Sequence, residues 1–278
     1  MELNEIKKKN EYYSRIIGEQ LTTRKAQINI DEIVFRASSV GDLCGAKGLG
    51  KTGEKRARYT YLEHTTGRKK EFTSKQTDKG NLTEGVSIAE ISEQLGRELT
   101  KNEVRLYDEY FTGECDIDDE ADDCIIDVKA SWDVFTHDDN KAAYNKDHED
   151  QLRVYMRLYK RSKAKLIYKL IDAPDEMVLK AIESENYKWP GLETPEWRQV
   201  EILINMVYTR ESFDRLVLNL GLGGDPLTDR LIDLFVEIPI EDRTKVYEFT
   251  HDQQKEDFII SRVVMARDYL KIHHNAKN

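Results

Sequence analysis

The chain has 278 residues, 39% of them hydrophobic and 35% charged, and a formal net charge of −10 at pH 7. This length and apolar content can bury a sizeable core. No apolar run is long enough to span a bilayer, so we expect a cytoplasmic protein with no membrane partner. Three scattered cysteines, Cys44, Cys115 and Cys124, argue against a disulfide framework and against an iron–sulfur cluster held by four thiolates.

Charge is distributed unevenly along the chain. Residues 1–79 contain 17 Lys and Arg against 11 Asp and Glu, a balance of +6, so the remaining residues carry −16. Each basic residue alone is most simply a solvated surface group, but as a group they favour a polyanion such as nucleic acid. Lys51, Arg56 and Arg58 are candidate phosphate contacts within this segment.

Residues 45–52 match the nucleotide-binding pattern G-x-x-x-x-G-K-[ST] in full, with Lys51 and Thr52 at its end. That motif requires a buried strand directly before it, and residues 39–44 make a poor buried strand. We therefore interpret the segment as a flexible Gly- and Lys-rich loop near nucleic acid. Nucleotide binding by this loop is kept as an alternative.

A helix and several strands are predicted next. The short Ile-rich stretch at residues 28–35 predicts a strand or a link to the core. Residues 77–98 have helical apolar spacing and carry Glu84. Strands are then predicted at residues 104–107, 110–118 and 124–130.

The last two of these strands form a hairpin that gathers charged side chains. Residues two apart on a strand share a face, so Asp127 and Lys129 lie side by side and Asp116 arrives from the paired strand. Ile125 and Val128 indicate that the second strand is buried, where a charge needs a partner or a metal. Carboxylates suit Mg²⁺ or Mn²⁺, and an adjacent lysine can position a water or offset phosphate charge.

A plain exposed hairpin is the alternative interpretation of this pattern. We accept it only for the acidic residues of the turn itself, which are expected to be solvated: Asp119, Glu120, Asp122 and Asp123.

Residues 132–147 are rich in Asp, Asn, Lys and aromatic residues and predict a long active-site loop. The following helical segment carries Gln151 and Tyr155, which are four apart and therefore share a face. On that face an amide and a phenol can reach the metal site or a nucleic-acid backbone. An ordinary amphipathic helix is the alternative. Residues 164–171 predict a further strand.

Beyond residue 175 the pattern is mainly helical. Three segments have helical apolar spacing: residues 176–187, 195–220 and 256–273. An edge strand is predicted at residues 245–250. We therefore divide the chain into a core of residues 1–175, which includes the basic N-terminal part, and a mainly helical C-terminal extension of residues 176–278 that packs on the core as one structural unit.

Together these motifs resemble a known family. Gly-x-x-Asp at residues 113–116, followed by hydrophobic-hydrophobic-Asp-x-Lys at residues 125–129, is similar to the core of the PD-(D/E)xK nucleases, in the branch of RecB-like and lambda-type (YqaJ-like) exonucleases. Glu84 falls where that branch carries an acidic residue on a helix. Gln151 and Tyr155 match its Gln-x-x-x-Tyr signature. Asp127 stands where many members of the wider superfamily have Glu, although Asp is common in this branch.

The resemblance implies a mixed α/β (α+β) fold with a restriction-endonuclease-like core, in which helices flank a central mixed sheet. It implies a Mg²⁺- or Mn²⁺-dependent deoxyribonuclease with two metal ions per site, most simply a phage-type exonuclease in the host cytoplasm. The implied catalytic residues are Glu84, Asp116, Asp127, Lys129, Gln151 and Tyr155. The implied metal ligands are Glu84, Asp116, Asp127 and the main-chain carbonyl of Val128.

A further match concerns phosphate binding. The sequence Arg-Ala-Ser-Ser-Val at residues 36–40 resembles the Ala-Ser element that helps to receive the 5′ phosphate in lambda-type exonucleases, which implies Arg36 and Ser38 as phosphate-binding residues. A serine pair before a short apolar segment is also a helix N-cap, and this alternative stays open.

The resemblance also implies double-stranded DNA ends as substrate, 5′ to 3′ digestion in phage-type recombination and a single-strand annealing protein as partner. A ring-shaped homotrimer would suit processive digestion. Within the same class, the alternative is a RecB-like or CRISPR-adaptation-type nuclease that trims ends or flaps. From other classes, the alternatives are a nucleotide-binding protein that uses residues 45–52 and a non-catalytic DNA-binding scaffold.

Overall fold

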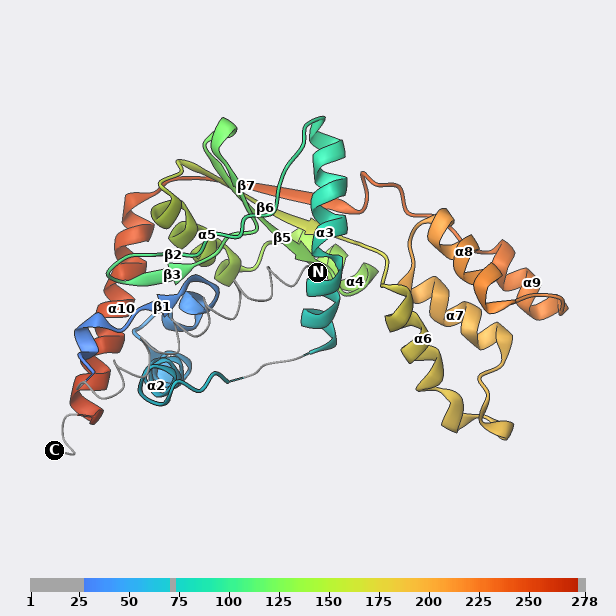
Figure 1. Ribbon diagram of the computed structural model, residues 1–278, viewed down its shortest axis with the longest axis horizontal. Helices are drawn as coiled ribbons and strands as arrows, with labels where there is room; N and C mark the ends of the chain where they lie inside the picture. The colour runs from blue at the N-terminus through green and yellow to red at the C-terminus, as the bar shows by residue number, and fades with distance from the viewer. Residues whose placement is uncertain (1–27, 71–73, 275–278) are drawn as a thin grey trace, which may run out of the picture.

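The computed structural model describes residues 28–70 and 74–274. The fold is mixed α/β, as predicted: a four-stranded sheet lies between helices, a small three-stranded sheet lies beside it, and a group of helices projects at one end (Figure 1). None of the helices in the described residues combines the length and the apolar composition that crossing a membrane would require.

The large sheet has the strand order β4–β5–β6–β7. Its strands are β4 (Ile117–Asp119), β5 (Cys124–Ala130), β6 (Lys163–Lys169) and β7 (Thr244–Thr250). β5 and β6 are parallel, whereas β4 and β7 run antiparallel to their neighbours, so the predicted central mixed sheet is confirmed. A parallel pair needs a long crossover, which here contains α4 (Val134–Ala142) and α5 (Lys146–Tyr159).

The small sheet has the order β1–β3–β2, formed by β1 (Phe35–Arg36), β3 (Phe111–Gly113) and β2 (Leu106–Tyr107). Phe35 and Phe111 are paired neighbours and are both fully buried in the main core. The single strand predicted at residues 110–118 is therefore divided, with β3 in the small sheet and β4 in the large one.

One face of the large sheet is covered by α5 and by α10 (Gln253–His274), in a core that also includes residues of α2 (Gly50–Thr66) and the 3₁₀ helix η2 (Ala37–Leu43). Ile125 of β5 belongs to this core. The other 3₁₀ segments are η1 (Ile30–Glu32), η3 (Glu120–Asp122), η4 (Asn186–Lys188) and η5 (Pro190–Leu192).

The opposite face of the sheet is covered by α3 (Lys75–Leu95), whose Ile88 packs with Ile126 of β5. Successive strand residues point to alternate faces. Asp127 and Lys129 therefore point toward α5, on the same face as Ile125, and α3 contacts the back of the same strand.

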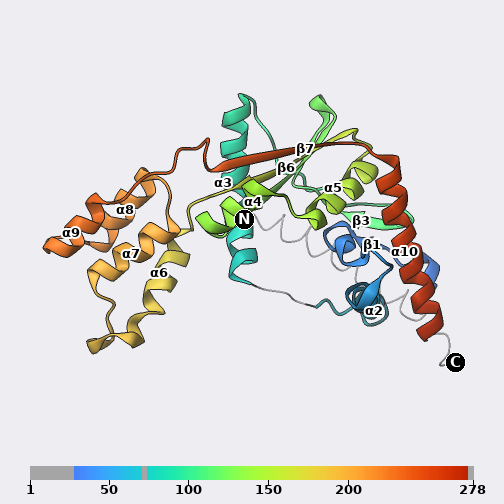
Figure 2. The ribbon, with the colours of Figure 1, turned by 180° about the vertical axis from the view of Figure 1, so that it is seen from behind.

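Four helices form a separate part of the molecule between β6 and β7, which we call the helical insertion. They are α6 (Asp175–Glu183), α7 (Glu196–Met206), α8 (Arg210–Leu220) and α9 (Pro226–Asp233). They pack around their own apolar cluster, in which the rings of Phe213 and Phe235 stack with centroids 3.9 Å apart. Figure 1 and the reverse view in Figure 2 show the helical insertion at the opposite end of the molecule from α10, with α3 between them.

The sequence predicted a helical extension from residue 176 to the end of the chain, and the structure divides the chain differently. After α9 the chain returns to the large sheet, because β7 pairs with β6 along its whole length. Phe249 of β7 and Val263 of α10 are buried in the main core. Residues 244–274 therefore complete the core, and the helices before them are an insertion within it.

Two segments predicted as loops contain helices. Residues 45–52 lead directly into α2, which begins at Gly50, so they are not a long flexible loop. Residues 132–147 contain α4, whose N-cap Asp133 accepts a hydrogen bond of 2.8 Å from the main-chain N–H of Thr136. The predicted helix at residues 195–220 is broken between α7 and α8, where the Asp172 carboxylate accepts from the N–H groups of Tyr208 and Thr209.

The turn of the β4–β5 hairpin also differs in one respect. Asp119 is not solvated as predicted, because it is 6% exposed and forms an ion pair with Arg97. Arg97 also contacts Asp122, at 2.6 Å, so one guanidinium neutralises two of the turn carboxylates.

Candidate active site

The β4–β5 hairpin brings the predicted charged residues together. Its antiparallel register sets Asp116, one residue before β4, opposite Asp127 of β5. Oδ2 of Asp116 accepts a hydrogen bond of 2.7 Å from the main-chain N–H of Val128. Nζ of Lys129 lies 2.7 Å from Oδ2 of Asp127. The pattern of alternating strand residues therefore produced the constellation that the sequence predicted.

Burial determines the charge balance of this hairpin. Asp127 is 1% exposed, whereas the Lys129 side chain is 27% exposed. Burial, and after it the negative charge of Asp127, raise the pKa of the Asp116 carboxyl to about 7 against the opposing effects of Lys129 and the Val128 N–H. Burial disfavours the Lys129 ammonium, but Asp127 and Asp116 outweigh burial and raise its pKa. Two carboxylates thus share one permanent positive charge.

Helix α5 supports the hairpin from the sheet face that Asp127 occupies. Nε2 of Gln151 donates to the Tyr155 hydroxyl at 2.9 Å and to Oδ1 of Asp127 at 3.4 Å. Burial raises the pKa of the Tyr155 phenol, which therefore stays neutral. The Tyr155 ring is seated against Gly113, where an added Cβ would come within 2.7 Å of Cε1. Gln151 and Tyr155 lie where the sequence predicted them.

Glu84, on α3, approaches the same site from the other side. Its carboxylate lines the cleft that also contains Asp116 and Lys129. It forms an ion pair with Nζ of Lys101 at 2.6 Å, and this hydrogen bond is the main reason that the pKa of Lys101 is raised. Within residues 28–70 and 74–274, no three His, Cys, Asp or Glu side chains converge closely enough to hold a metal ion, so Glu84 does not complete a three-acid cluster.

The hairpin residues nevertheless fit a divalent cation through two carboxylates. Oδ2 of Asp127 is buried and accepts no hydrogen bond from the described residues, although the Lys129 ammonium stands beside it. Burial, and after it the negative charge of Asp127, raise the pKa of Asp116 at the same point. Mg²⁺ and Mn²⁺ bind hard oxygen donors, and here two carboxylates face a single ammonium, which leaves one negative charge unbalanced when both are ionised. Val128, whose carbonyl is the other implied ligand, lines the cleft.

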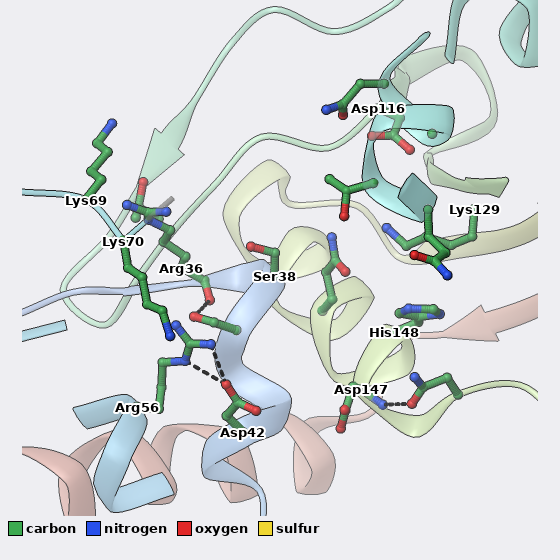
Figure 3. Close-up of a pocket in the computed structure, with 18 of the residues that line it drawn as sticks. Arg36, Ser38, Asp42, Arg56, Lys69, Lys70, Asp116, Lys129, Asp147 and His148 are labelled. Atoms are coloured by element: carbon green, nitrogen blue, oxygen red, sulfur yellow. Dashed lines mark hydrogen bonds and ion pairs between the residues drawn. The ribbon is translucent and has the colours of Figure 1, made fainter. Parts of the chain in front are cut away.

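A cleft of about 1470 Å³ opens over this hairpin (Figure 3). Asp116 and Lys129 lie on one side of it, and Arg36, Ser38 and Arg56 lie on the other. The predicted metal site and three of the predicted phosphate-binding residues therefore share one cavity, large enough for several nucleotide units.

Two of the cleft arginines are paired within the protein. Nη2 of Arg36 lies 3.0 Å from Oε2 of Glu63, and Nη2 of Arg56 lies 2.6 Å from Oδ2 of Asp42. Ser38 lies inside η2, whose N-cap position is Arg36, so it is not the helix cap that the alternative interpretation required. A phosphate bound here would have to share each arginine with a carboxylate.

Lys51 and Arg58 lie elsewhere. Both are exposed on α2, and neither lines the cleft, although other residues of the same helix, including Thr52, Lys55 and Arg56, do. The nucleotide-binding alternative also lacks its strand, because residues 37–43 form η2 instead.

Sequence reasoning missed His148 and Tyr168, which line the cleft beside Lys129. His148 precedes Gln151 by three and Tyr155 by seven residues, so helical spacing alone would have placed all three on one face. Lys69 and Lys70, at the far side of the cleft, were counted only as part of the basic segment.

No protein-family model and no curated protein sequence matches the chain. Solved structures do. A phage-related exonuclease from Haemophilus somnus 129PT is 23% identical, with 89% of this chain and 97% of that chain covered and a TM-score of 0.64. LHK-Exo in complex with dAMP is 12% identical, with 90% and 96% covered and a TM-score of 0.52. Another structure of LHK-Exo, an alkaline exonuclease from Laribacter hongkongensis, is 11% identical, with 89% of this chain and 96% of that chain covered and a TM-score of 0.50. At these identities the likeness is one of fold.

Proposed function

We propose that this chain, whose fold is that of the lambda-type (YqaJ-like) exonucleases, hydrolyses DNA phosphodiester bonds with the help of Mg²⁺ or Mn²⁺. The observation that carries the proposal is the pair of Asp116 and the buried Asp127, with Lys129, at one side of a large cleft. More specifically, we propose an exonuclease that acts at duplex ends in the 5′ to 3′ direction. LHK-Exo was solved with dAMP bound, and a deoxynucleoside monophosphate is the product proposed here.

In the proposed site, Asp116, Asp127 and the Val128 carbonyl would hold the cation, which when bound lowers the pKa of a water and offsets phosphate charge. Lys129 keeps its proton, and its partly exposed ammonium donates to a phosphate oxygen in the cleft, where negative charge develops during hydrolysis. Gln151 holds Asp127 in place, and Tyr155 holds Gln151.

The proposed role of Glu84 depends on its release from Lys101. To hold a second cation or a water, its carboxylate must exchange Lys101 for that ligand. Arg36, Ser38 and Arg56 are proposed to bind backbone phosphates at the far side of the cleft. The annealing-protein partner and the homotrimer remain predictions from the resemblance.

The test is digestion of linear duplex DNA labelled separately at its 5′ and 3′ ends, with Mg²⁺ or with EDTA. We expect Mg²⁺-dependent release of nucleotides from the 5′ end. Asp127→Ala should abolish cleavage, and Lys129→Ala should lower kcat by roughly 10²–10³-fold because one transition-state donor is lost. Asp118→Asn is the matched control, since Asp118 belongs to the same hairpin but pairs with Arg161 at 2.7 Å and does not line the cleft.

Each alternative has its own outcome in this experiment. Preferred cleavage of flaps would favour the RecB-like end-trimming alternative. Failure to cleave any linear, nicked, flapped or single-stranded DNA would sink the nuclease proposal. In that case, DNA binding that survives Asp127→Ala would favour a scaffold, and ATP binding lost in Lys51→Ala would favour nucleotide binding.

A further inference from the structure

His148 occupies the active-site face of α5, yet neither the motif nor the scheme above uses it. It lies in the first turns of the helix, one turn before Gln151. Its ring lines the cleft, and Figure 3 shows it next to Lys129. On the sheet below, Lys129 of β5 is the register partner of Tyr168 of β6. The imidazole therefore stands over the two residues that flank the site on adjacent strands.

The hydrogen bonds of Tyr168 favour one tautomer of His148. Nδ1 of His148 lies 2.8 Å from the Tyr168 hydroxyl oxygen, and the main-chain N–H of Asn145 donates to that same oxygen at 3.0 Å. A phenol has one hydrogen to donate. Among the described residues the acceptor for that hydrogen is Nδ1 of His148, because Asn145 supplies a donor. Nδ1 is then unprotonated, and the ring hydrogen resides on Nε2.

The surroundings of His148 keep the ring neutral. Tyr168 is 1% exposed, so its hydrogen bond is shielded from water. Burial, and then the positive charge of Lys129, lower the pKa of His148 to about 4, with Asp127 opposing them. A neutral imidazole whose Nδ1 already accepts a hydrogen bond has one donor left, the N–H at Nε2. The two ring nitrogens point away from each other. With Nδ1 held over the sheet, Nε2 is left for the cleft.

We propose that His148 is a substrate-contacting residue, whose Nε2–H donates a hydrogen bond to a non-bridging oxygen of the phosphate bound beside Lys129. The proposal rests on the proposed function and adds a donor to it. A neutral donor suits this position, because a second cation beside Lys129 would oppose the cation that the two carboxylates attract. A preorganised donor stabilises developing charge without reorganising at the moment of reaction.

A purely structural role is the competing explanation, in which His148 only links α5 to β6 through Tyr168. Two amide substitutions separate these explanations. In His148→Gln the side-chain amide reaches the position of Nε2, so the donor to phosphate is kept and the link to Tyr168 is lost. In His148→Asn the amide oxygen reaches the position of Nδ1, so the link is kept and the donor is lost.

The experiment measures kcat and KM of the full chain for end-labelled duplex DNA with Mg²⁺, together with thermal unfolding of each variant. We expect His148→Asn to lower kcat by about 10²-fold with KM little changed, the usual effect of removing one such donor. His148→Gln should retain most of the activity. His273→Asn is the control, since this exposed histidine of α10 contacts the Tyr269 ring and does not line the cleft.

The opposite order, with Asn active and Gln inactive, would overturn the proposal in favour of the structural link. Equal activity of both variants and the native protein would overturn it as well, while leaving the proposed function intact. An inactive native protein would instead contradict the proposed function, and with it the role of His148. Imidazole ¹⁵N NMR spectra at pH 7 test the proposal without turnover. We expect the signals of a neutral ring protonated at Nε2, and we expect them to shift when dAMP is added. A ring protonated at Nδ1, or a charged ring, would overturn the proposal.

Discussion

Asp116 carries a carboxyl with a pKa of about 7, raised from 3.8 by burial and by Asp127. A carboxyl must lose its proton to bind Mg²⁺, so we expect the affinity for Mg²⁺ to weaken by roughly tenfold for each pH unit below 7 and to level off above pH 8. Calorimetric titration with Mg²⁺ at pH 6 and pH 8 measures this directly. Equal affinity at the two pH values would contradict it, and Asp116→Asn should bind weakly at both.

The raised pKa of Asp116 also makes the stability of the metal-free protein depend on pH. Between about pH 4 and pH 7 the folded protein holds a proton at Asp116 that the unfolded chain has released, so this group makes the folded state less stable as pH rises through that window. Bound Mg²⁺ should therefore raise the unfolding temperature more at pH 8 than at pH 6.

The charge of Arg56, in the cleft, can be released by a single substitution. Its partner Asp42 lies 2.6 Å away in the same cleft. We expect Asp42→Asn to bind duplex DNA more tightly, because one more cation becomes available to phosphate. For the same reason, the slope of log Kd against log salt concentration should be steeper by about one unit. Fluorescence anisotropy at several salt concentrations measures both quantities.

The matched control is Asp214→Asn on the helical insertion, which removes a carboxylate paired with Arg210 at 3.4 Å and does not touch the cleft. It changes the net charge equally. If both variants bind DNA alike, the effect is one of overall charge and Arg56 is not a phosphate contact.

For single residues, the sequence predicted the positions of those side chains that are set by one strand or by one helix face. Asp116, Asp127 and Lys129 follow from strand alternation, and Gln151 with Tyr155 from a four-residue spacing. Arg56 pairs with Asp42 of the preceding element, η2, and no strand or helix spacing links the two residues, so the sequence pattern did not predict the pair. Lys51 and Arg56 carry the same charge on the same helix, but Arg56 lines the cleft and Lys51 does not.

Helix α5 packs closely against the small sheet at Gly113. A Cβ at Gly113 would come within 2.7 Å of Tyr155 and 3.0 Å of Ala37. Gly113→Ala must therefore displace α5 or β3, and we expect it to destabilise the protein by about 1–3 kcal/mol, as overpacking does. Because the Tyr155 hydroxyl accepts a hydrogen bond from Gln151, the proposed nuclease activity should fall as well. Chemical denaturation and the cleavage assay measure the two effects.

Gly85→Ala is the matched control for this substitution. Gly85 lies in α3 with no atom within 4 Å of an added Cβ. Alanine there should leave activity unchanged and stabilise the protein by about 0.5–1 kcal/mol, since glycine is the poorer helix former. A neutral Gly113→Ala would mean that α5 is not seated as described.

Elements were predicted well where the apolar spacing was regular and poorly where polar residues predominate. β5 has the bounds that the sequence predicted, and its run of β-branched residues explains why. α4 was missed because its sequence, Val-Phe-Thr-His-Asp-Asp-Asn-Lys-Ala, has few strong helix formers, while the Asp133 cap starts the helix. α2 was missed because glycines and lysines at its start resemble a loop.

On the scale of the whole molecule, the helical insertion enters and leaves the core at neighbouring strand ends. Lys169 of β6 is paired with Thr244 of β7, and the N–H of Leu170 donates to the carbonyl of Arg243 at 2.8 Å. We expect that residues 174–240 can be replaced by a short turn, and that the shortened chain folds with a cooperative thermal transition. Circular dichroism during heating tests this.

The comparison variant ends at residue 243 and so lacks β7 and α10. It should fail to fold cooperatively, because residues of both elements are buried in the main core. If the turn variant also fails, the helical insertion contributes to the stability of the core. Its contact with α3, where Nζ of Lys79 lies 5.3 Å from the centre of the Tyr208 ring, would be the first place to examine.

The fold class followed from the sequence, but the division of the chain did not. The helical patterns after residue 175 are real, and nothing in their spacing says whether they end the chain or interrupt it. The edge strand at residues 245–250 was the local signal. Its partner β6 lies more than seventy residues earlier, a separation that periodicity cannot reveal.

The late position of β7 and α10 has a consequence during protein synthesis. A ribosome completes the hairpin, α5, β6 and all of the helical insertion before it makes the last strand. Until then β6 has an unpaired edge and the apolar face covered by α10 is open, which favours association with other nascent chains. The proposed nuclease site can therefore mature only after β7 and α10 have been made, so we expect a message broken before codon 244 to yield an aggregating fragment rather than a DNA-cutting one.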